Sequence, residues 1–282
     1  MILIADSGAT STHWRLIDSQ GAINQFKTSG FNPYYQKSED LSHQVSELAE
    51  EIESVVKTLY YYGAGCGAEQ NRKLVKQILL EYYRSAGIYV EDDMLAAARA
   101  LCGNAPGIAC ILGTGANSCY YNGENIEQQV ASLGYVLGDE GSGAYLGKRL
   151  LADYLRDDMD APVAERFKKR FNLSRDEVLD KVYYEAAPGR YMAGFTKFLL
   201  QNSKEPYCYS LVYKAFSEFF ERNVLKYDAI GTTSVHFSGS VAYYFSNVLR
   251  QVATDKGVVL KNIIESPIAG LTLYHKNQHF QP

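Results

Sequence analysis

The sequence contains few cysteines, and their spacing forms no recognisable set. Five cysteines in 282 residues are an odd number without a C-x-x-C pair, which disfavours a disulfide framework and favours reduced thiols. An excess of basic residues is also missing. The formal net charge is −4, so the chain carries no electrostatic footprint for nucleic acid. We therefore expect a cytoplasmic protein without a nucleic-acid partner.

Long apolar runs are missing as well. The run Met1–Ala5 ends at Asp6 and has no basic residue before it, which is not the pattern of a secretory signal. The longest uncharged stretch, residues 100–123, is interrupted by Gly, Pro and Asn and does not resemble a membrane span. What is present is ordinary: 46% hydrophobic and 21% charged residues are typical of a globular protein. We expect no membrane partner, and a core in one large or two ordinary domains.

One strand and its turn organise the chain. The apolar run 108–112 leads into Gly113, Thr114 and Gly115, which predicts a buried strand followed by a sharp turn. Backbone N–H groups beside the two glycines, together with the Thr114 hydroxyl, can cradle a phosphate. An ordinary hairpin with glycines at positive φ is the alternative. A second loop of the same kind, residues 6–12, favours the phosphate interpretation.

The order of strand, glycine loop, strand and strand occurs twice. Apolar and β-branched runs predict its strands in two groups: 1–5, 14–17 and 23–27, then 108–112, 118–121 and 126–130. Other strands are expected at 58–62, 88–90 and 235–237, and helices at 38–56, 74–82, 94–101, 240–248 and 268–274, with 160–226 mostly helical. A further helix is expected from near residue 141, with Leu146, Leu150, Tyr154 and Leu155 on one side. Strands that alternate with helices predict an α/β protein. The composition turns to Gly, Asn and Pro near 103–107, where we expect a domain boundary.

Four motifs then resemble a known family. Residues 6–12, 113–117, 138–142 and 238–240 occur in the order found in the actin-like ATPase and sugar-kinase superfamily. The chain most resembles its N-acetylglucosamine kinase branch, grouped with the BadF-type ATPases, over nearly its whole length. The resemblance implies two RNase H-like domains, each a mixed sheet flanked by helices, with an interdomain cleft. They would comprise residues 1–105 joined by 268–282, and residues 106–267.

The resemblance also implies roles for particular residues. Asp93 would be the general base and Asp6 would lie near Mg²⁺, through a water molecule. Residues implied to bind ATP and its phosphates are Gly8, Thr10, Ser11, Thr12, Thr114, Gly115 and, at the adenosine, Gly239. Residues implied to contact the sugar are Asn32, Asp93, Ala116, Asn117 and Asp139. Phosphoryl transfer needs charge neutralisation, positioning and a proton acceptor, and this set supplies all three.

Several of these assignments have a structural alternative. Asp92 and Asp93 both suit a helix N-terminus, and Asp92 is a rival for the base. Asp139, Glu140 or Ser142 could each cap the helix that starts near residue 141, and we favour a functional role for Asp139.

Asn32 could be only the turn residue before Pro33. The chain also departs from the family pattern. Where the family often has Gly-Trp-Gly, residues 132–135 read Ser-Leu-Gly-Tyr, and Ala116 stands where serine is commoner. N-acetyl specificity is therefore open. The cysteine cluster of zinc-containing relatives is missing from the sequence.

The sequence therefore predicts a cytoplasmic kinase that uses ATP and Mg²⁺ to phosphorylate an amino sugar, N-acetylglucosamine at its 6-hydroxyl first among them. Glucosamine, N-acetylmannosamine and a muramic-type sugar are close variants, and a homodimer is compatible with the family. One alternative is a BadF-type activator ATPase, whose iron–sulfur cluster needs exposed cysteines; Cys110 and Cys119 flank the phosphate loop. The other is a non-catalytic sugar or nucleotide sensor.

Overall fold

The computed structural model describes residues 1–8, 10–52 and 54–279. The chain folds into two compact units. Unit 1 comprises Met1–Asn104 and the C-terminal segment that begins at Ser266, and unit 2 comprises Ala105–Glu265. The chain therefore leaves unit 1, forms the whole of unit 2, and returns.

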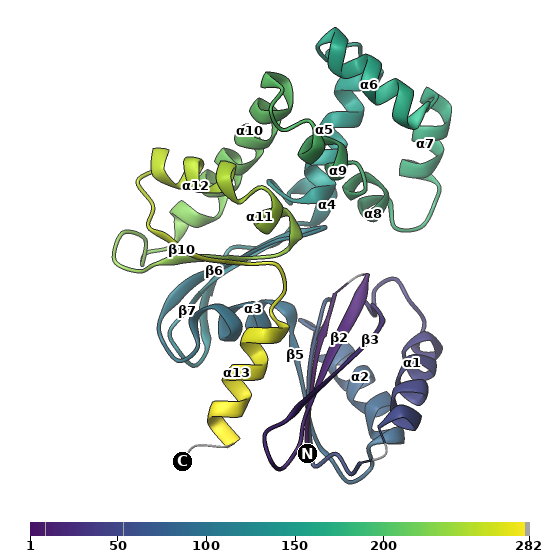
Figure 1. The fold of residues 1–282 in the computed structure, drawn as a ribbon, viewed down its shortest axis with the longest axis vertical. Helices are drawn as coiled ribbons and strands as arrows, with labels where there is room; N and C mark the ends of the chain where they lie inside the picture. The colour runs from purple at the N-terminus through teal and green to yellow at the C-terminus, as the bar shows by residue number, and fades with distance from the viewer. Residues whose placement is uncertain (9, 53, 280–282) are drawn as a thin grey trace. The chain divides into compact units, whose positions relative to one another are not determined.

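Unit 1 is built on a five-stranded mixed sheet with the strand order β3-β2-β1-β4-β5 (Figure 1). Its strands are β1 (Ile2–Ser7), β2 (Ser11–Ile17), β3 (Ile23–Ser29), β4 (Thr58–Gly63) and β5 (Gly87–Asp92). β1, β2 and β3 form an antiparallel meander, whereas β4 and β5 run parallel to β1. Because β1, β4 and β5 are parallel, their carboxyl ends meet at one edge of the sheet.

Helices cover both faces of this sheet. They are α1 (Ser38–Glu51), α2 (Glu69–Tyr82), α3 (Asp93–Cys102) and α13 (Ile268–His279). Successive residues of a strand point to opposite faces, and β1 shows this directly. Leu3 packs in the core beneath α1 and α2, while Ile4 packs with Ala96 of α3 and Leu271 of α13.

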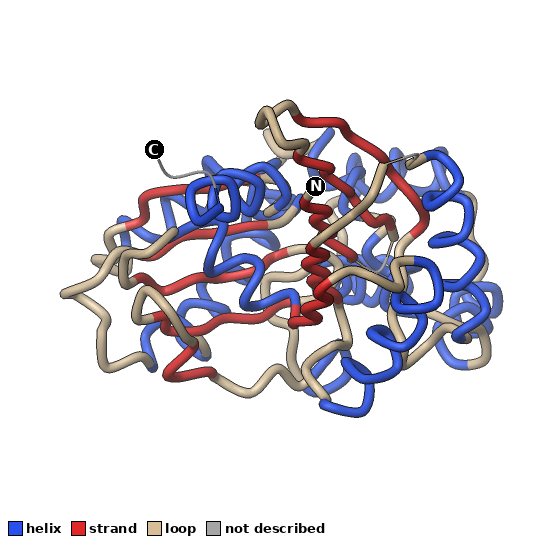
Figure 2. The backbone as a smooth tube through the Cα atoms, turned by 90° about the horizontal axis from the view of Figure 1, so that it is seen from below, coloured by secondary structure: helices blue, strands red, loops and turns tan. Residues whose placement is uncertain are grey.

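Unit 2 repeats the sheet with the order β10-β9-β6-β7-β8, and both sheets have their strands in red in Figure 2. Its strands are β6 (Gly107–Leu112), β7 (Ala116–Tyr121), β8 (Ile126–Gln129), β9 (Val235–Ser238) and β10 (Leu260–Ile264). Its helices are α4 (Gly134–Leu137), α5 (Gly143–Leu155), α6 (Ala161–Phe171), α7 (Arg175–Tyr183), α8 (Pro188–Ala193), α9 (Thr196–Gln201), α10 (Pro206–Arg222), the 3₁₀ turn η1 (Val224–Lys226), α11 (Ser240–Tyr244) and α12 (Ser246–Asp255).

The two sheets are related strand by strand. β6, β7 and β8 form an antiparallel meander like β1, β2 and β3, and β9 and β10 run parallel to β6 as β4 and β5 do to β1. This confirms the predicted fold class: two RNase H-like domains, each a mixed sheet flanked by helices, as in actin-like ATPases.

The structure differs from the expected elements in several places, and the helix expected over 240–248 is divided into α11 and α12. The helix predicted over 38–56 ends at Glu51, and Val56 is buried in the core of unit 1 instead. β-branched valines have low helix propensity, and a core position for Val56 outweighs the apolar period. β10 was not expected, because Leu260–Ile264 is a short, largely polar segment at a sheet edge.

No helix within the described ranges combines the length and the apolar character that a membrane span requires.

Candidate functional site

The carboxyl edge of the first sheet carries three carboxylates, those of Asp6, Asp92 and Asp93. In the strand register Asp6 lies opposite Tyr62 of β4, and Gly63 lies opposite Asp92 of β5. Asp6 therefore belongs to β1 and not to the turn that the sequence suggested. The chain turns directly from β5 into α3, so Asp93 starts its helix at this same edge.

Asp92 and Asp93 have different tasks. The Asp92 carboxylate accepts a 2.8 Å hydrogen bond from the Leu95 N–H and is the N-cap of α3. A side-chain oxygen at this position satisfies one of the free N–H groups of the first helical turn. Asp93 is the first residue of the helix and is not needed as its cap.

The surroundings of Asp93 disfavour its charged form. The pKa of Asp93 is raised to about 7, mainly by burial and additionally by the nearby charges of Asp92 and Asp6. Burial likewise raises the pKa of Asp6 to about 6, against the lowering effects of the Ser266 hydrogen bond and the Arg15 charge. A carboxyl that titrates near neutral pH can accept and release a proton under physiological conditions.

Asp6 is held by a residue from the end of the chain. The Ser266 hydroxyl donates a 2.9 Å hydrogen bond to one Asp6 carboxylate oxygen. Across the described residues there is no group of three His, Cys, Asp or Glu side chains that could hold a metal by itself. One carboxylate at a strand end nevertheless suits Mg²⁺, which keeps most of its water and phosphate ligands. Asp6 is thus a donor of the right kind for a magnesium–nucleotide complex.

The first glycine loop is a tight hairpin between β1 and β2. The Gly8 N–H donates to the Ser11 carbonyl at 3.0 Å, and Thr10 is exposed. Ser11 and Thr12 already belong to β2. The buried Thr12 hydroxyl lies 2.8 Å from the Ser7 hydroxyl and donates a hydrogen bond to the Ser29 carbonyl of β3. The Thr12 side chain therefore links the three strands β1, β2 and β3.

Asn32 forms a turn at the same edge. Its side-chain oxygen accepts a 3.0 Å hydrogen bond from the Tyr34 N–H, the pattern of an Asx turn. It also packs against Gly65, which has φ +80° and where an added Cβ would lie 2.5 Å from the Asn32 oxygen. Cys66 follows, and burial and the charges of Asp93 and Asp92 raise the pKa of its thiol to about 12. Asn32 and Asp93 therefore flank one small region of unit 1.

The second glycine loop is docked on a helix. The Gly113 carbonyl accepts a 2.8 Å hydrogen bond from the Gly143 N–H, and the Thr114 carbonyl accepts one of 3.0 Å from the Ala144 N–H at the start of α5. The Gly113 N–H bonds the Gly115 carbonyl at 3.0 Å, so it is not uncovered as the sequence suggested. Within the described residues the Thr114 and Gly115 N–H groups donate to no protein acceptor.

Asp139 lies over this loop. Its carboxylate accepts a 3.2 Å hydrogen bond from the Ala116 N–H, and a Cβ at Gly115 would lie 3.2 Å from it. Burial raises the pKa of Asp139, and the Ala116 N–H and the Lys148 charge oppose that rise. The backbone of Asp139 has φ 59°, a left-handed conformation that costs energy for a non-glycine residue.

The cap of α5 is Ser142, and neither Asp139 nor Glu140 fills that role. The Ser142 hydroxyl accepts a 3.1 Å hydrogen bond from the Tyr145 N–H, and the side chain is buried. Glu140 instead pairs with Arg222 at 3.4 Å. Asp139 does not cap α5, and its carboxylate contacts the second glycine loop instead.

The backbone at position 239 has room only for glycine. Its φ is 115°, and a Cβ would lie 2.3 Å from the Leu112 carbonyl oxygen. Only glycine allows the turn from β9 into α11 to approach the start of the second loop so closely. Asn117 lies in β7, where its side-chain oxygen accepts a 3.1 Å hydrogen bond from the Gln129 amide.

The candidate residues thus form two sets, one in each unit. The set in unit 1 is Asp6, Gly8, Thr10, Ser11, Thr12, Asn32 and Asp93, and the set in unit 2 is Thr114, Gly115, Ala116, Asn117, Asp139 and Gly239. The sequence did not predict Ser266 as a partner of Asp6. Ser-Pro at 266–267 signals a helix start, but no local pattern shows a contact across 260 residues.

Comparisons with known proteins find relatives that share this fold. A solved structure from Porphyromonas gingivalis, named a candidate N-acetylglucosamine kinase, is 38% identical with a TM-score of 0.90, and the match covers 99% of this chain and 100% of that one. A candidate N-acetylglucosamine kinase from Chromobacterium violaceum, 18% identical with a TM-score of 0.74 over 97% and 98% of the two chains, shares the fold. No protein-family model matches the chain.

A curated relative gives the same family. N-acetyl-D-glucosamine kinase from Dictyostelium discoideum is 27% identical over an alignment of 168 residues, and the match covers 54% of this chain and 53% of that enzyme. The matched part thus spans about half the length of the curated relative. Together with the full-length match at 38% identity, these findings establish that the chain belongs to the N-acetylglucosamine kinase family of ATP-dependent phosphotransferases.

Proposed function

We propose that the protein is a cytoplasmic kinase that transfers the γ-phosphoryl group of ATP to the 6-hydroxyl of N-acetylglucosamine. The observation that carries this proposal is the pair of carboxylates at the start of α3. Asp92 caps the helix, which leaves Asp93 as a half-buried carboxyl whose pKa is raised to about 7. This is the environment that a general base for an alcohol requires.

In the proposed reaction Asp93 accepts the proton of the sugar hydroxyl as that oxygen attacks the γ-phosphorus. General-base help of this kind contributes roughly 10²–10⁴-fold in rate. Bound Mg²⁺ would neutralise charge on the phosphates, and Asp6 would hold it through a water molecule. The Ser266 hydroxyl keeps Asp6 oriented for this purpose.

The two glycine loops would bind the phosphates of ATP. In unit 1 the Gly8 turn presents Thr10 and Ser11, while Thr12 fixes the shape of the hairpin. In unit 2 the free N–H groups of Thr114 and Gly115 can donate to phosphate oxygens.

Gly239 would admit the adenosine beside the turn into α11. For the sugar, Asp139 and the Ala116 and Asn117 backbone at the start of β7 would orient the acceptor from unit 2. Asn32 would contribute from unit 1, beside Asp93. Oriented hydroxyl contacts of this kind lower the entropic barrier to transfer.

The deciding experiment measures ADP release from MgATP across a sugar panel with a blank lacking sugar. The panel holds N-acetylglucosamine, glucosamine, glucose, N-acetylmannosamine and N-acetylmuramic acid. We expect the largest sugar-dependent release with N-acetylglucosamine, and a product phosphorylated at the 6-position by nuclear magnetic resonance. Release equal to the blank with every sugar would overturn the kinase proposal.

The cysteines disfavour the activator ATPase. Cys66, Cys110, Cys119 and Cys208 are buried and Cys102 is half-buried, so no exposed thiol is available to hold a cluster. A substantial ADP release without sugar, together with bound iron, would restore that alternative. A non-catalytic sensor would bind ATP and release no ADP under any condition of the panel.

A further inference from the structure

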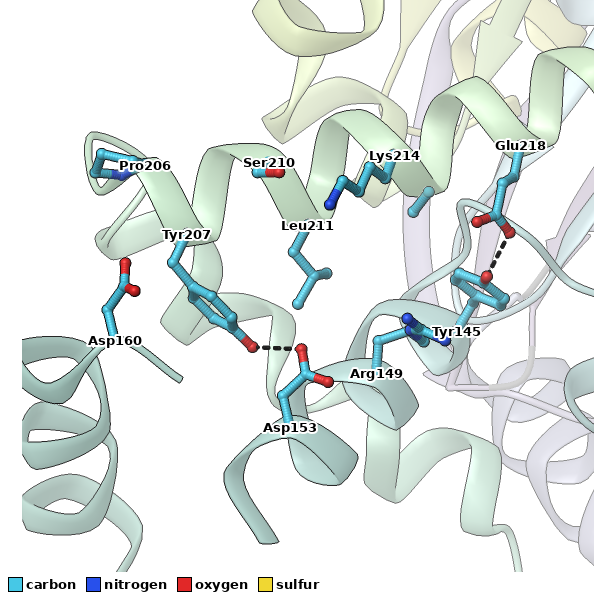
Figure 3. Close-up of a pocket in the computed structure, with 11 residues that line it drawn as sticks. Tyr145, Arg149, Asp153, Asp160, Pro206, Tyr207, Ser210, Leu211, Lys214 and Glu218 are labelled. Carbon is cyan, nitrogen blue, oxygen red and sulfur yellow. Dashed lines mark hydrogen bonds between the residues drawn. The ribbon is translucent and has the colours of Figure 1, made fainter. Parts of the chain in front are cut away.

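A pocket in unit 2 lies outside every motif discussed so far. It is a cavity of about 350 Å³ between α5 and α10, and none of its lining residues belongs to the candidate kinase site. Cavities of this size hold small organic molecules. Figure 3 shows its charged side chains, which come mainly from these two helices.

Two hydrogen bonds join these helices, each from a tyrosine hydroxyl on one helix to a carboxylate on the other. The Tyr207 hydroxyl of α10 donates a 2.8 Å hydrogen bond to Asp153 of α5. In return the Tyr145 hydroxyl of α5 donates a 2.5 Å hydrogen bond to Glu218 of α10. Both bonds are drawn in Figure 3. Each carboxylate is therefore engaged with the opposite helix.

Because both carboxylates bind tyrosine hydroxyls, the Arg149 and Lys214 side chains form no ion pair with them. Arg149 stands four residues before Asp153 on α5, and Lys214 stands four residues before Glu218 on α10, the spacing at which ion pairs form along a helix. Neither pair forms. Across the described residues, Arg149 and Lys214 make no ion pair and no side-chain hydrogen bond. Both are exposed and line the pocket, so a ligand can reach them.

Asp153 and Glu218 line the pocket beside these two cations, and the other end carries a third carboxylate. Asp160 lies beside Pro206, away from Lys214 and Arg149 in Figure 3. Asp160 stands at the N-cap position of α6 but its side chain accepts no cap hydrogen bond, so its oxygens remain available. Leu211 and the ring of Tyr207 supply apolar surface between the two ends.

We propose that this pocket is a second ligand site, which binds a phosphorylated sugar. Arg149 and Lys214 would hold the phosphate with charge-assisted hydrogen bonds. Asp160 would accept hydrogen bonds from the sugar hydroxyls, and the Tyr207 ring would cover an apolar face of the sugar. This site goes beyond the proposed kinase reaction and does not depend on it.

The test is direct binding, independent of turnover. Isothermal titration calorimetry at low ionic strength would use glucose 6-phosphate and inorganic phosphate as probes. We expect Arg149→Met and Lys214→Met each to weaken glucose 6-phosphate binding about tenfold, as expected for the loss of one charge-assisted contact. The matched control is Arg156→Met, which removes an exposed cation at the end of α5 that does not line the pocket.

The sugar end is tested separately. Asp160→Ala should weaken binding of glucose 6-phosphate and leave inorganic phosphate unaffected. Equal affinity for the two probes, unchanged binding in the Arg149→Met/Lys214→Met double variant, or no binding of either probe at millimolar concentration would each overturn the proposal. Since binding at the kinase site does not use Arg149 or Lys214, its presence or absence cannot produce the expected pattern.

Discussion

At the scale of single residues, Asp92 and Asp93 are adjacent and identical in chemistry, yet their surroundings differ. Asp92 accepts the Leu95 N–H and serves the helix. Asp93 is half-buried near two other carboxylates, and these surroundings raise its pKa to about 7. The sequence alone left these two residues as rivals, because both suit the N-terminus of a helix. The hydrogen bond from the Leu95 N–H identifies Asp92 as the helix cap and leaves Asp93 as the candidate base.

The first prediction concerns these two residues. Asp93→Asn should lower kcat roughly 10²–10⁴-fold, because an amide cannot accept the hydroxyl proton. The KM values for ATP and the sugar should change little. Asp92→Ala should lower the free energy of unfolding by about 1 kcal/mol through loss of the cap and keep most of the activity. Steady-state kinetics and denaturant melts measure both effects. If Asp92→Ala abolished turnover while Asp93→Asn kept it, the roles would be reversed.

The second prediction concerns pH. The folded pKa values of Asp93 and Asp6, about 7 and about 6, lie above their ordinary value of 3.8. Groups raised in this way stabilise the fold at low pH, and their contribution is lost as pH rises through the folded pKa. Because of these two residues, the free energy of unfolding should therefore decrease as the pH rises from about 4 to about 7.

Substitution reveals this contribution. Asp93→Asn should raise the melting temperature at pH 8 and leave it almost unchanged at pH 3, where Asp93 is protonated in both the folded and the unfolded protein. Asp158→Asn, on an exposed side chain, is the control and should change neither value. Thermal melts in buffers of equal ionic strength measure the difference. An equal rise at both pH values would contradict the assignment of the raised pKa.

At the scale of elements, the turn from β9 into α11 depends on one glycine. We predict that Gly239→Ala lowers stability by several kcal/mol, since its Cβ would lie 2.3 Å from the Leu112 carbonyl at a positive φ. Gly257→Ala is the matched control, because Gly257 also has a positive φ, of 68°, but no atom within 4 Å of an added Cβ. It should cost only about 1 kcal/mol.

Chemical unfolding of the two variants measures the difference. Equal losses in Gly239→Ala and Gly257→Ala would show that the approach to Leu112 does not matter. Gly239→Ala should also weaken ADP binding if the adenosine lies at this turn.

The elements themselves were largely predictable, and their partners were not. Apolar runs ending in glycine loops located β1 and β6, and the repeated order of strands indicated two related sheets. The end of α1 at Glu51 was missed because its apolar period continues into a segment whose valine belongs to the core. The Gly113 N–H was expected to be free, yet it closes its own turn. Such details depend on backbone geometry that residue types alone do not determine.

At the scale of the whole molecule, ligand binding should stabilise the protein. We predict that MgADP at one hundred times its Kd raises the free energy of unfolding by about 2.7 kcal/mol, which corresponds to a rise in Tm of about 5–10 °C. Chelation of Mg²⁺ with EDTA should remove most of this rise.

The same experiment on Asp6→Asn tests the magnesium assignment. In this variant the rise in Tm with ADP should be small both with and without Mg²⁺, because the carboxylate that holds the ion is lost. Asp18→Asn is the control, since Asp18 is a turn carboxylate between β2 and β3. An undiminished Mg²⁺ effect in Asp6→Asn would contradict the role given to Asp6.

The return of the chain to unit 1 has a consequence for synthesis. Unit 2 is continuous in sequence, so a ribosome can release all of it before Ser266 and α13 emerge. Unit 1 begins first and finishes last, because Ile268–His279 must still cover one face of its sheet. Asp6 meets its hydrogen-bond partner only after another 260 residues have been translated. A nascent chain therefore carries a partly uncovered sheet face and an unsupported Asp6 until Ser266 and α13 have emerged.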